Sequence, residues 1–260
     1  MKRKVILISI DGMRPDGFLQ CGSPMVQALR EQAAYTLSAK AVWPSVTLPC
    51  HMSMFHSVPP ERHGTTTNLY VPPVHPVTGL FEQVERFGGN CAMFYGWEPL
   101  RDIARPGSLN HASYLQSYTE EHTDAILTDR ALACIRQYHP DFLFLYLVET
   151  DEKGGHDNGW MSAPYLSRIA DALDCVRRVW EDAGEEYTIV ITADHGGHDR
   201  SHGSDSPEDM TIPMFFVGSE FTPGELQKEL SLLDLAPTIT DLLGIPADRV
   251  WEGQSVLKDM

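Results

Sequence analysis

Four uninterrupted apolar runs constrain the fold of this chain more than any other feature of its sequence. Runs rich in β-branched residues and Leu are typical of strands that are buried on both faces, as in a parallel sheet. The runs are VILISI (5–10), DFLFLYLVET (141–150), YTIVITA (187–193) and IPMFFVG (212–218). They favour a central sheet that other elements cover on both sides.

Amphipathic segments lie between and after these runs. The segment 23–35, for example, carries Met25, Leu29 and Ala33 at helical spacing. We predict helices over 23–35, 126–138, 164–183 and 234–243, the last of them ended by Gly244. Strands that alternate with helices predict an α/β fold with a mostly parallel central sheet and helices on both faces.

The segment 69–122 differs from the rest of the chain, because it is rich in Pro, Gly, Tyr and His and its periodicity is weak. We interpret it as an excursion at the sheet edge or a small cap over a site. No Gly/Ser linker or run of charges marks a domain boundary, and 260 residues lie within the range of one α/β domain. We therefore expect a single domain over 1–260 that includes this segment.

The composition favours some kinds of binding partner and some cellular compartments over others. The formal net charge of −16 disfavours binding to a nucleic-acid polymer, because phosphate backbones attract basic surfaces. The five cysteines are widely spaced and form no CxxC pair, which favours a reduced compartment. The apolar run 5–10 is too short for a signal-peptide core or a membrane span. We expect a cytoplasmic protein without a membrane partner, and the sequence does not specify its oligomeric state.

Acidic and histidine side chains follow three of the four apolar runs, at the end of the sheet where open α/β folds bind ligands. They are Asp11, then Asp151 and His156, then Asp194, His195, His198 and His202. A single Asp at such a place can be a helix N-cap. Three converging carboxylates, however, would repel one another and raise one another's pKa. Divalent metal ions would remove this repulsion, and Asp with His suits Zn²⁺ or, alternatively, Mn²⁺.

The stretch AVWPSVTLPCH (41–51) offers candidate nucleophiles in Ser45, Thr47 and Cys50. Pro44 and Pro49 indicate a rigid turn before a short helix. A hydroxyl at a helix N-terminus lies among N–H groups that favour a bound anion, so Thr47 could be a metal-activated nucleophile. An ordinary helix cap by Ser or Thr is the alternative that this stretch alone leaves open.

Six short motifs occur in order along the chain. They are ISIDGMRPD, SVTLPCH, PPERHGTTTN, VETDEKGGH, ITADHGG and RSHGS. With the closing segments LLDLAPTITDLLGIP and WEGQS, they resemble the alkaline phosphatase superfamily, and most closely its nucleotide pyrophosphatase/phosphodiesterase family. SVTLPCH resembles the T-x-P-N-H nucleophile turn of that family, and VETDEKGGH resembles its E-x-P-D-x-x-G-H motif.

The resemblance implies two divalent metal ions, with Zn²⁺ as the first candidate and Mn²⁺ as the alternative. One implied ligand set is Asp151, His156 and His202, and the other is Asp11, Asp194, His195 and the hydroxyl oxygen of Thr47. The resemblance also implies hydrolysis of phosphodiester or phosphoanhydride bonds through a phospho-threonine intermediate, with a small phosphorylated substrate such as a nucleotide. His198 has no ligand role in this mapping, and either a solvated loop position or contact with substrate is open for it.

Three positions depart from the family pattern. Cys50 stands where the diesterases have Asn, Thr150 where they have Pro, and Gly197 where they have Met. Sulfatases mature a Cys within C-x-P-x-R, but Cys50 is followed by His-Met-Ser-Met, so that motif is absent. We therefore interpret Cys50 as a structural residue or one that lies behind the site.

Asn68 bears on the class of substrate. The resemblance implies that it donates to a non-bridging phosphate oxygen, as in the diesterases, whereas a dianionic monoester needs more cationic help, often from Arg. Arg14 and Arg62 lie near the motifs, and we favour structural roles for both. A diester or phosphoanhydride is therefore the expected substrate. The alternatives are a phosphomonoesterase, a phosphonate (C–P) hydrolase and a non-catalytic protein that binds metal or phosphate.

Overall fold

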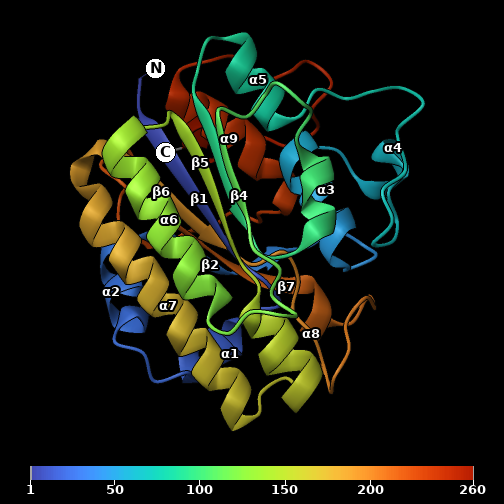
Figure 1. Ribbon diagram of the computed structural model, residues 1–260, viewed down its shortest axis with the longest axis vertical. Helices are drawn as coiled ribbons and strands as arrows, with labels where there is room; N and C mark the ends of the chain where they lie inside the picture. Colours follow the sequence, from blue (N-terminus) through green and yellow to red (C-terminus); the bar gives the residue numbers. More distant parts are fainter. Residues whose placement is uncertain (1, 260) are drawn as a thin grey trace.

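The computed structural model describes residues 2–259, which form an α/β fold around one eight-stranded sheet (Figure 1). The strand order across the sheet is β4-β3-β5-β1-β6-β7-β2-β8. The strands are β1 (Lys4–Ile10), β2 (Ala34–Lys40), β3 (Cys91–Tyr95), β4 (His111–Tyr114), β5 (Phe142–Leu147), β6 (Tyr187–Thr192), β7 (Thr211–Val217) and β8 (Gly224–Glu225).

The sheet is mostly parallel, which confirms the predicted fold class. β7 runs antiparallel to both of its neighbours, β6 and β2, whereas the other neighbouring pairs are parallel. The four apolar runs form β1, β5, β6 and β7, and the first three are adjacent in the centre of the sheet. Their side chains are almost completely buried, as expected for strands covered on both faces.

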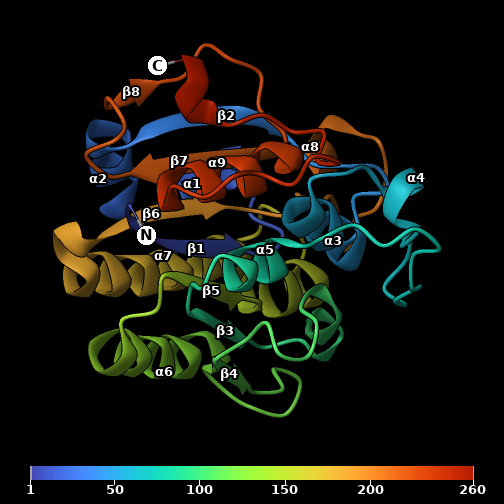
Figure 2. The same cartoon turned by 90° about the horizontal axis from the view of Figure 1, so that it is seen from above.

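Helices cover both faces of the sheet, as Figure 2 shows from above. One face carries α1 (Pro15–Gln20), α2 (Met25–Gln32), α6 (Thr123–Tyr138) and α7 (Ala163–Ala183). The other face carries α3 (Thr47–His56), α5 (Leu80–Arg86) and α9 (Leu235–Leu243). Two short helices, α4 (Pro60–His63) and α8 (Pro207–Met210), lie in the loops beyond the carboxyl ends of the central strands.

The helix predicted over 23–35 is too long at its C-terminal end. α2 ends at Gln32, and Tyr35 lies in β2, which pairs with β7 and β8. β2 reads AYTLSAK, and its second half alternates between buried and exposed residues. Because this strand lies near the edge of the sheet, it needs no continuous apolar run. The apolar residues at its start therefore cannot be distinguished by spacing from those of α2.

The segment 69–122 contributes α5, the strands β3 and β4 at one edge of the sheet, and the short 3₁₀ helix η1 (Glu98–Ile103). The side chains of β3 are largely buried, whereas those of the edge strand β4 are half-buried or exposed. Across the described residues 2–259, we find no helix with the length and apolar character needed to cross a membrane.

Candidate active site

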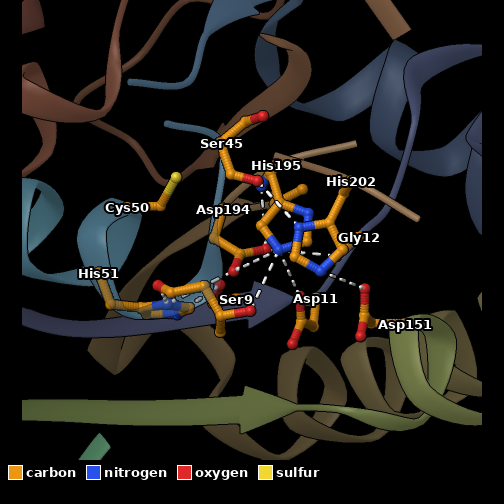
Figure 3. Close-up of polar contacts among 12 residues, drawn as sticks. Ser9, Asp11, Gly12, Ser45, Cys50, His51, Asp151, Asp194, His195 and His202 are labelled. Carbon is orange, nitrogen blue, oxygen red and sulfur yellow. Dashed lines mark hydrogen bonds and ion pairs between the residues drawn. The ribbon is translucent and has the colours of Figure 1, made fainter. Parts of the chain in front are cut away.

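Three aspartates meet beyond the carboxyl ends of the three central strands. Asp11 follows β1, Asp194 follows β6 by two residues, and Asp151 lies in a π-helical turn, η2 (Thr150–His156), that follows β5. All three are buried. Figure 3 shows them pointing toward one another, with His195 and His202 between them. The parallel order β5-β1-β6 therefore brings together residues that are far apart in the sequence.

The ligand atoms of these residues form two overlapping groups. Asp11, Asp194 and His195 form one group, and Asp151, His195 and His202 form the other; within each group the atoms lie within 4.8 Å of one another. His195 Nε2 is 3.3 Å from Asp11 Oδ1 and 3.4 Å from Asp194 Oδ2. The rings of His195 and His202 are stacked, with centroids 3.9 Å apart. His195 thus belongs to both groups, whereas the family pattern assigns it only to the ion held by Asp11 and Asp194.

His156 joins the second group from the solvent side. Its Nε2 is 3.3 Å from Asp151 Oδ2, and its side chain is 41% exposed. The hydrogen bond with Asp151 raises the pKa of His156 to about 9, despite partial burial. Burial lowers the pKa of His202 to about 4, and the nearby His195 adds to this effect. The two outer histidines therefore differ in charge although they flank the same carboxylate.

The backbone orients all three histidines in the same way. The Nδ1–H of His195 donates to Gly196 O at 2.8 Å, that of His202 to Ser45 O at 2.9 Å, and that of His156 to Arg200 O at 3.0 Å. In His195 and His202 this bond selects the tautomer in which Nε2 keeps its lone pair, whereas His156 must first lose the Nε2 proton that its raised pKa retains. A backbone or carboxylate acceptor on one ring nitrogen is the usual support for a histidine that binds metal through the other.

Several carboxylate oxygens at this place lack hydrogen bonds. Asp11 Oδ1, Asp151 Oδ1 and Asp194 Oδ2 are buried and accept none. Burial, followed by the charges of Asp194 and Asp151, raises the pKa of Asp11 well above its usual value. Unpaired buried carboxylates are costly unless a cation compensates them. Oxygen and imidazole ligands with this arrangement fit divalent metal ions of the Zn²⁺ or Mn²⁺ type.

Thr47 is the first residue of α3 and faces the group formed by Asp11, Asp194 and His195. Its Oγ1 is 3.2 Å from His195 Nε2, and the residue is 5% exposed. Asn68 lies next to it, because the backbone N–H of Leu48 donates to Asn68 Oδ1 at 3.1 Å. This bond orients the amide and leaves the Nδ2 hydrogens of Asn68 available as donors.

A small cavity of about 70 Å³ opens onto these residues. Thr47, Asn68 and the predicted ligands Asp11, Asp151, His156 and His202 line it, together with Trp97, Tyr118, Tyr146, Val148 and Glu152. Trp97 and Tyr118 come from the segment 69–122, so part of that segment borders the site. Among the described residues that line the cavity there is no Lys or Arg.

The two arginines near the motifs are engaged elsewhere. Arg14 forms two hydrogen bonds with Asp16 and donates from Nη1 to Gly197 O at 2.9 Å. Arg62 donates to Val250 O and to Glu252 at the surface. Neither lines the cavity. The structure therefore agrees with an anchoring role for both side chains.

His198 and Cys50 also lie outside the cavity lining. The Nδ1–H of His198 donates to Oδ1 of the buried Asp209 at 2.7 Å, so His198 is tied to the loop that carries His202. Cys50 is fully buried in α3, with its thiol 3.9 Å from Val42 O. Burial raises the pKa of this thiol well above its usual value, which keeps it protonated and unreactive.

Two residues that support the site were missed by the sequence reasoning. The hydroxyl of Tyr146 donates to Asp11 Oδ2. His51 Nδ1 lies 2.8 Å from Thr47 O and 3.4 Å from Asp194 Oδ2, so it connects the start of α3 to β6. The sequence could have indicated a role for Tyr146, since a hydroxyl inside the apolar run FLFLYL needs a buried hydrogen-bond partner.

Trp160 accounts for one departure from the family pattern. Its indole N–H donates to Gly12 O at 2.9 Å, which helps to hold the turn after β1. The ring packs against Gly197, where a Cβ atom would come within 2.2 Å of the indole. The space that the family's Met would need at position 197 is therefore occupied by Trp160.

Comparisons with known proteins point to one superfamily. The family model for type I phosphodiesterase/nucleotide pyrophosphatase matches residues 5–103, and the metalloenzyme superfamily model matches residues 87–247. The chain is 25% identical over 221 residues to ectonucleotide pyrophosphatase/phosphodiesterase family member 1 of Mus musculus, covering 74% of this chain and 24% of that protein. It is 27% identical over 137 residues to phosphopentomutase of Symbiobacterium thermophilum, covering 52% of this chain and 34% of that protein. The chain thus spans about a quarter to a third of the length of these curated relatives.

A solved structure shares the whole fold. Murine ectonucleotide pyrophosphatase/phosphodiesterase 5, as an inactive variant in complex with AMP, superposes with a TM-score of 0.82 at 14% identity and covers 97% of both chains. At this identity the likeness supports the fold alone. The metalloenzyme model, however, matches more than half of the chain, and the predicted resemblance is confirmed. The chain belongs to the metalloenzyme superfamily, that of alkaline phosphatase, and resembles its nucleotide pyrophosphatase/phosphodiesterase branch.

Proposed function

We propose that this chain hydrolyses phosphodiester or phosphoanhydride bonds in a small phosphorylated substrate, with Thr47 as the nucleophile. One observation carries the proposal: a hydroxyl at the start of a helix lies 3.2 Å from His195 Nε2, in a site where buried carboxylate oxygens lack hydrogen bonds. The match to the phosphodiesterase model supports the same reaction class.

The residues that would hold two divalent ions are those that converge beyond the sheet. They are Asp11, Asp194, His195 and Thr47 for one ion, and Asp151, His156 and His202 for the other. When bound, such ions supply positive charge that stabilises the attacking and leaving oxygens of an in-line displacement. We propose Zn²⁺ as the metal, with Mn²⁺ as the alternative, because both accept carboxylate and imidazole ligands.

Thr47 supplies the nucleophilic oxygen. Its Oγ1 gives up a proton to solvent and forms a bond to phosphorus while the bond to the leaving oxygen breaks. The leaving alcohol or phosphate takes up a proton from solvent, and a phospho-threonine remains. Water then cleaves this intermediate and restores the hydroxyl. The position of Thr47 at the first residue of α3 suits this role, because N–H groups at a helix N-terminus favour the negative oxygens of a phosphate.

Asn68 favours a diester. Since its Oδ1 accepts from Leu48 N–H, its Nδ2 hydrogens can donate to a non-bridging phosphate oxygen. A monoester carries one more negative charge, and none of the described residues that line the cavity is a Lys or Arg that could compensate it. Another phosphoryl-group activity of the superfamily is the second candidate, because the chain also matches a phosphopentomutase. We place the activity in the cytoplasm, since all five cysteines are unpaired.

The test compares hydrolysis rates of bis-p-nitrophenyl phosphate, the p-nitrophenyl ester of thymidine monophosphate, and p-nitrophenyl phosphate. Each is measured with metal-stripped protein and after addition of Zn²⁺ or Mn²⁺. We expect both diesters to be cleaved much faster than the monoester, and only with metal present. The Thr47→Ala variant should lose turnover while it keeps its metal. Monoester rates above the diester rates, or full activity of Thr47→Ala, would refute the proposal.

A further inference from the structure

One wall of the cavity carries a carboxylate that belongs to neither predicted ligand group. Glu152 lines the cavity one residue after the predicted ligand Asp151. Both of its carboxylate oxygens are buried and make no hydrogen bond of good geometry, although the hydroxyls of Ser117 and Tyr118 lie beside them. Ser117 Oγ is itself buried without a hydrogen bond. Glu152 therefore places a carboxylate at the cavity, next to the hydroxyls of Ser117 and Tyr118.

The cations nearest in sequence are paired with other groups. Lys153 donates to Glu149 Oε1 at 2.6 Å and to the backbone carbonyl of Glu120 at 3.0 Å. Arg168 lies 3.9 Å from Glu149 and 3.4 Å from Asp171. Since no Lys or Arg is among the described residues that line the cavity, Glu152 adds negative charge beside the place where the scissile phosphate would lie.

Two aromatic side chains line the cavity together with this carboxylate. Trp97 is partly buried, and Tyr118 is 69% exposed, and both line the same cavity as Glu152. Aromatic faces attract cations and also pack against the carbon atoms of a small substituent. A carboxylate that lines a cavity together with two rings is thus complementary to a group that donates hydrogen bonds. A second phosphate at this position would instead meet a like charge.

We propose that Glu152 determines substrate specificity: it favours phosphodiesters whose second substituent carries a hydrogen-bond donor, and it disfavours substrates that carry another phosphate there. This inference rests on the proposed function and favours phosphodiesters over phosphoanhydrides as its substrates. The donor could be the ammonium of an amino alcohol or the hydroxyls of a polyol. Both satisfy the same carboxylate, and only the ammonium adds charge.

Binding to protein that cannot turn over its ligand tests the proposal directly. The metal-loaded Thr47→Ala variant is titrated calorimetrically with mixed p-nitrophenyl phosphodiesters of ethanolamine, glycerol and methanol, and with ATP. We expect the ethanolamine or glycerol diester to bind about tenfold more tightly than the methyl diester, because a charge-assisted hydrogen bond distinguishes them. Tighter binding of the ethanolamine diester alone would show that Glu152 selects an ammonium group. Similar binding of the ethanolamine and glycerol diesters would show that a neutral donor is enough.

The double variant Thr47→Ala/Glu152→Gln should lose most of this ratio and should bind ATP more tightly relative to the methyl diester. Glu121→Gln in the same background is the matched control, since Glu121 is exposed and lies outside the cavity, 3.8 Å from Lys153. A ratio that survives Glu152→Gln, or that Glu121→Gln lowers equally, would overturn the inference. If Glu152→Gln does not fold, the affinities of the Thr47→Ala variant with Glu152 intact decide the question. Equal binding of all three diesters to that variant would overturn the inference.

Failure of the proposed function would look different. In that case protein with Thr47 intact would not hydrolyse the methyl diester at all. Hydrolysis of that diester without any donor preference in binding would leave the phosphodiesterase function standing and remove only the role of Glu152.

Discussion

The hydroxyl of Tyr146 in β5 donates a hydrogen bond to Asp11 Oδ2 at the end of the neighbouring strand β1. The bond leaves Asp11 Oδ1, which has no hydrogen bond of its own, directed toward His195. Tyr146 is fully buried, and the charge of Asp11 adds to burial in raising the pKa of its phenol well above the usual value. Tyr146 thus acts as a fixed donor that orients a predicted metal ligand.

Replacing Tyr146 with Phe should weaken metal binding. Loss of a hydrogen bond behind a ligand typically lowers metal affinity by about 10- to 100-fold. Competition with a chromophoric chelator would measure this affinity. The control is Tyr187→Phe, because the Tyr187 hydroxyl is also buried but makes no hydrogen bond. Equal affinities of the two variants would show that the contact with Asp11 does not support the ligand.

Adding Zn²⁺ or Mn²⁺ to metal-free protein should raise the melting temperature. Binding to the folded state alone contributes about 2.7 kcal/mol at a free metal concentration a hundred times Kd. Asp194→Asn should abolish most of this shift, whereas Asp205→Asn should retain it, since Asp205 is exposed and belongs to neither ligand group. Scanning calorimetry with and without chelator measures both, and a metal-independent melting temperature would argue against the site.

Asp209 should matter more for stability than its partner His198. Asp209 is fully buried and accepts hydrogen bonds from Ser204 N at 2.8 Å, Ser204 Oγ at 2.7 Å and His198 Nδ1 at 2.7 Å. Asp209→Ala should lower the free energy of unfolding by about 2–3 kcal/mol, because these donors lose their acceptor. His198 is 42% exposed, so His198→Ala should cost less than about 1 kcal/mol. Urea titration of metal-free protein would compare them, and equal losses would contradict this assignment.

The buried His63 should make the fold sensitive to acid. Burial lowers its pKa to about 4, and its Nδ1 accepts a hydrogen bond from Thr65 N at 3.1 Å, which protonation would break. Between pH 6.5 and 4 the unfolded chain binds a proton that the folded chain does not. The free energy of unfolding should therefore fall as pH decreases through this window, by up to about 1.4 kcal/mol per pH unit from this group.

The variant His63→Asn isolates this contribution. Its amide oxygen can accept from Thr65 N–H and does not titrate, so the variant should lose less stability between pH 6.5 and 4. His75→Asn is the control, because His75 is exposed. Denaturant titrations at several pH values would compare the slopes, and parallel curves for His63→Asn and the unmodified protein would rule out this explanation.

The fold class and the strand ends could be predicted because they depend on local patterns. A run such as VILISI has no polar face, so it can only be buried on both sides, and the first polar residue after it must lie at the sheet edge. The rules for parallel sheets place β5, β1 and β6 in one sheet, but they do not fix the order of these strands. β2, β3, β4 and β8 were not predicted, since these strands are short or lie near an edge of the sheet and have no long apolar run.

The supporting contacts could not be predicted in the same way. Tyr146 and Asp11 are separated by 135 positions, and Thr47 and His195 by 148. Whether such pairs meet depends on strand register and on the angle at which α3 approaches the sheet. Trp160 and Gly197 show the same limit, because the indole that occupies the space beside Gly197 comes from a separate loop.

The sequence by itself therefore determined an α/β fold, its superfamily and the kinds of side chain that gather at the carboxyl edge of the sheet. These follow from periodicity and from motifs a few residues long. Only the tertiary structure decided which oxygens remain without hydrogen bonds, which tautomer His195 and His202 adopt, and that Glu152 lines the same cavity as Trp97 and Tyr118. Those properties depend on distances between segments that are remote in the chain, and packing of the whole domain sets such distances.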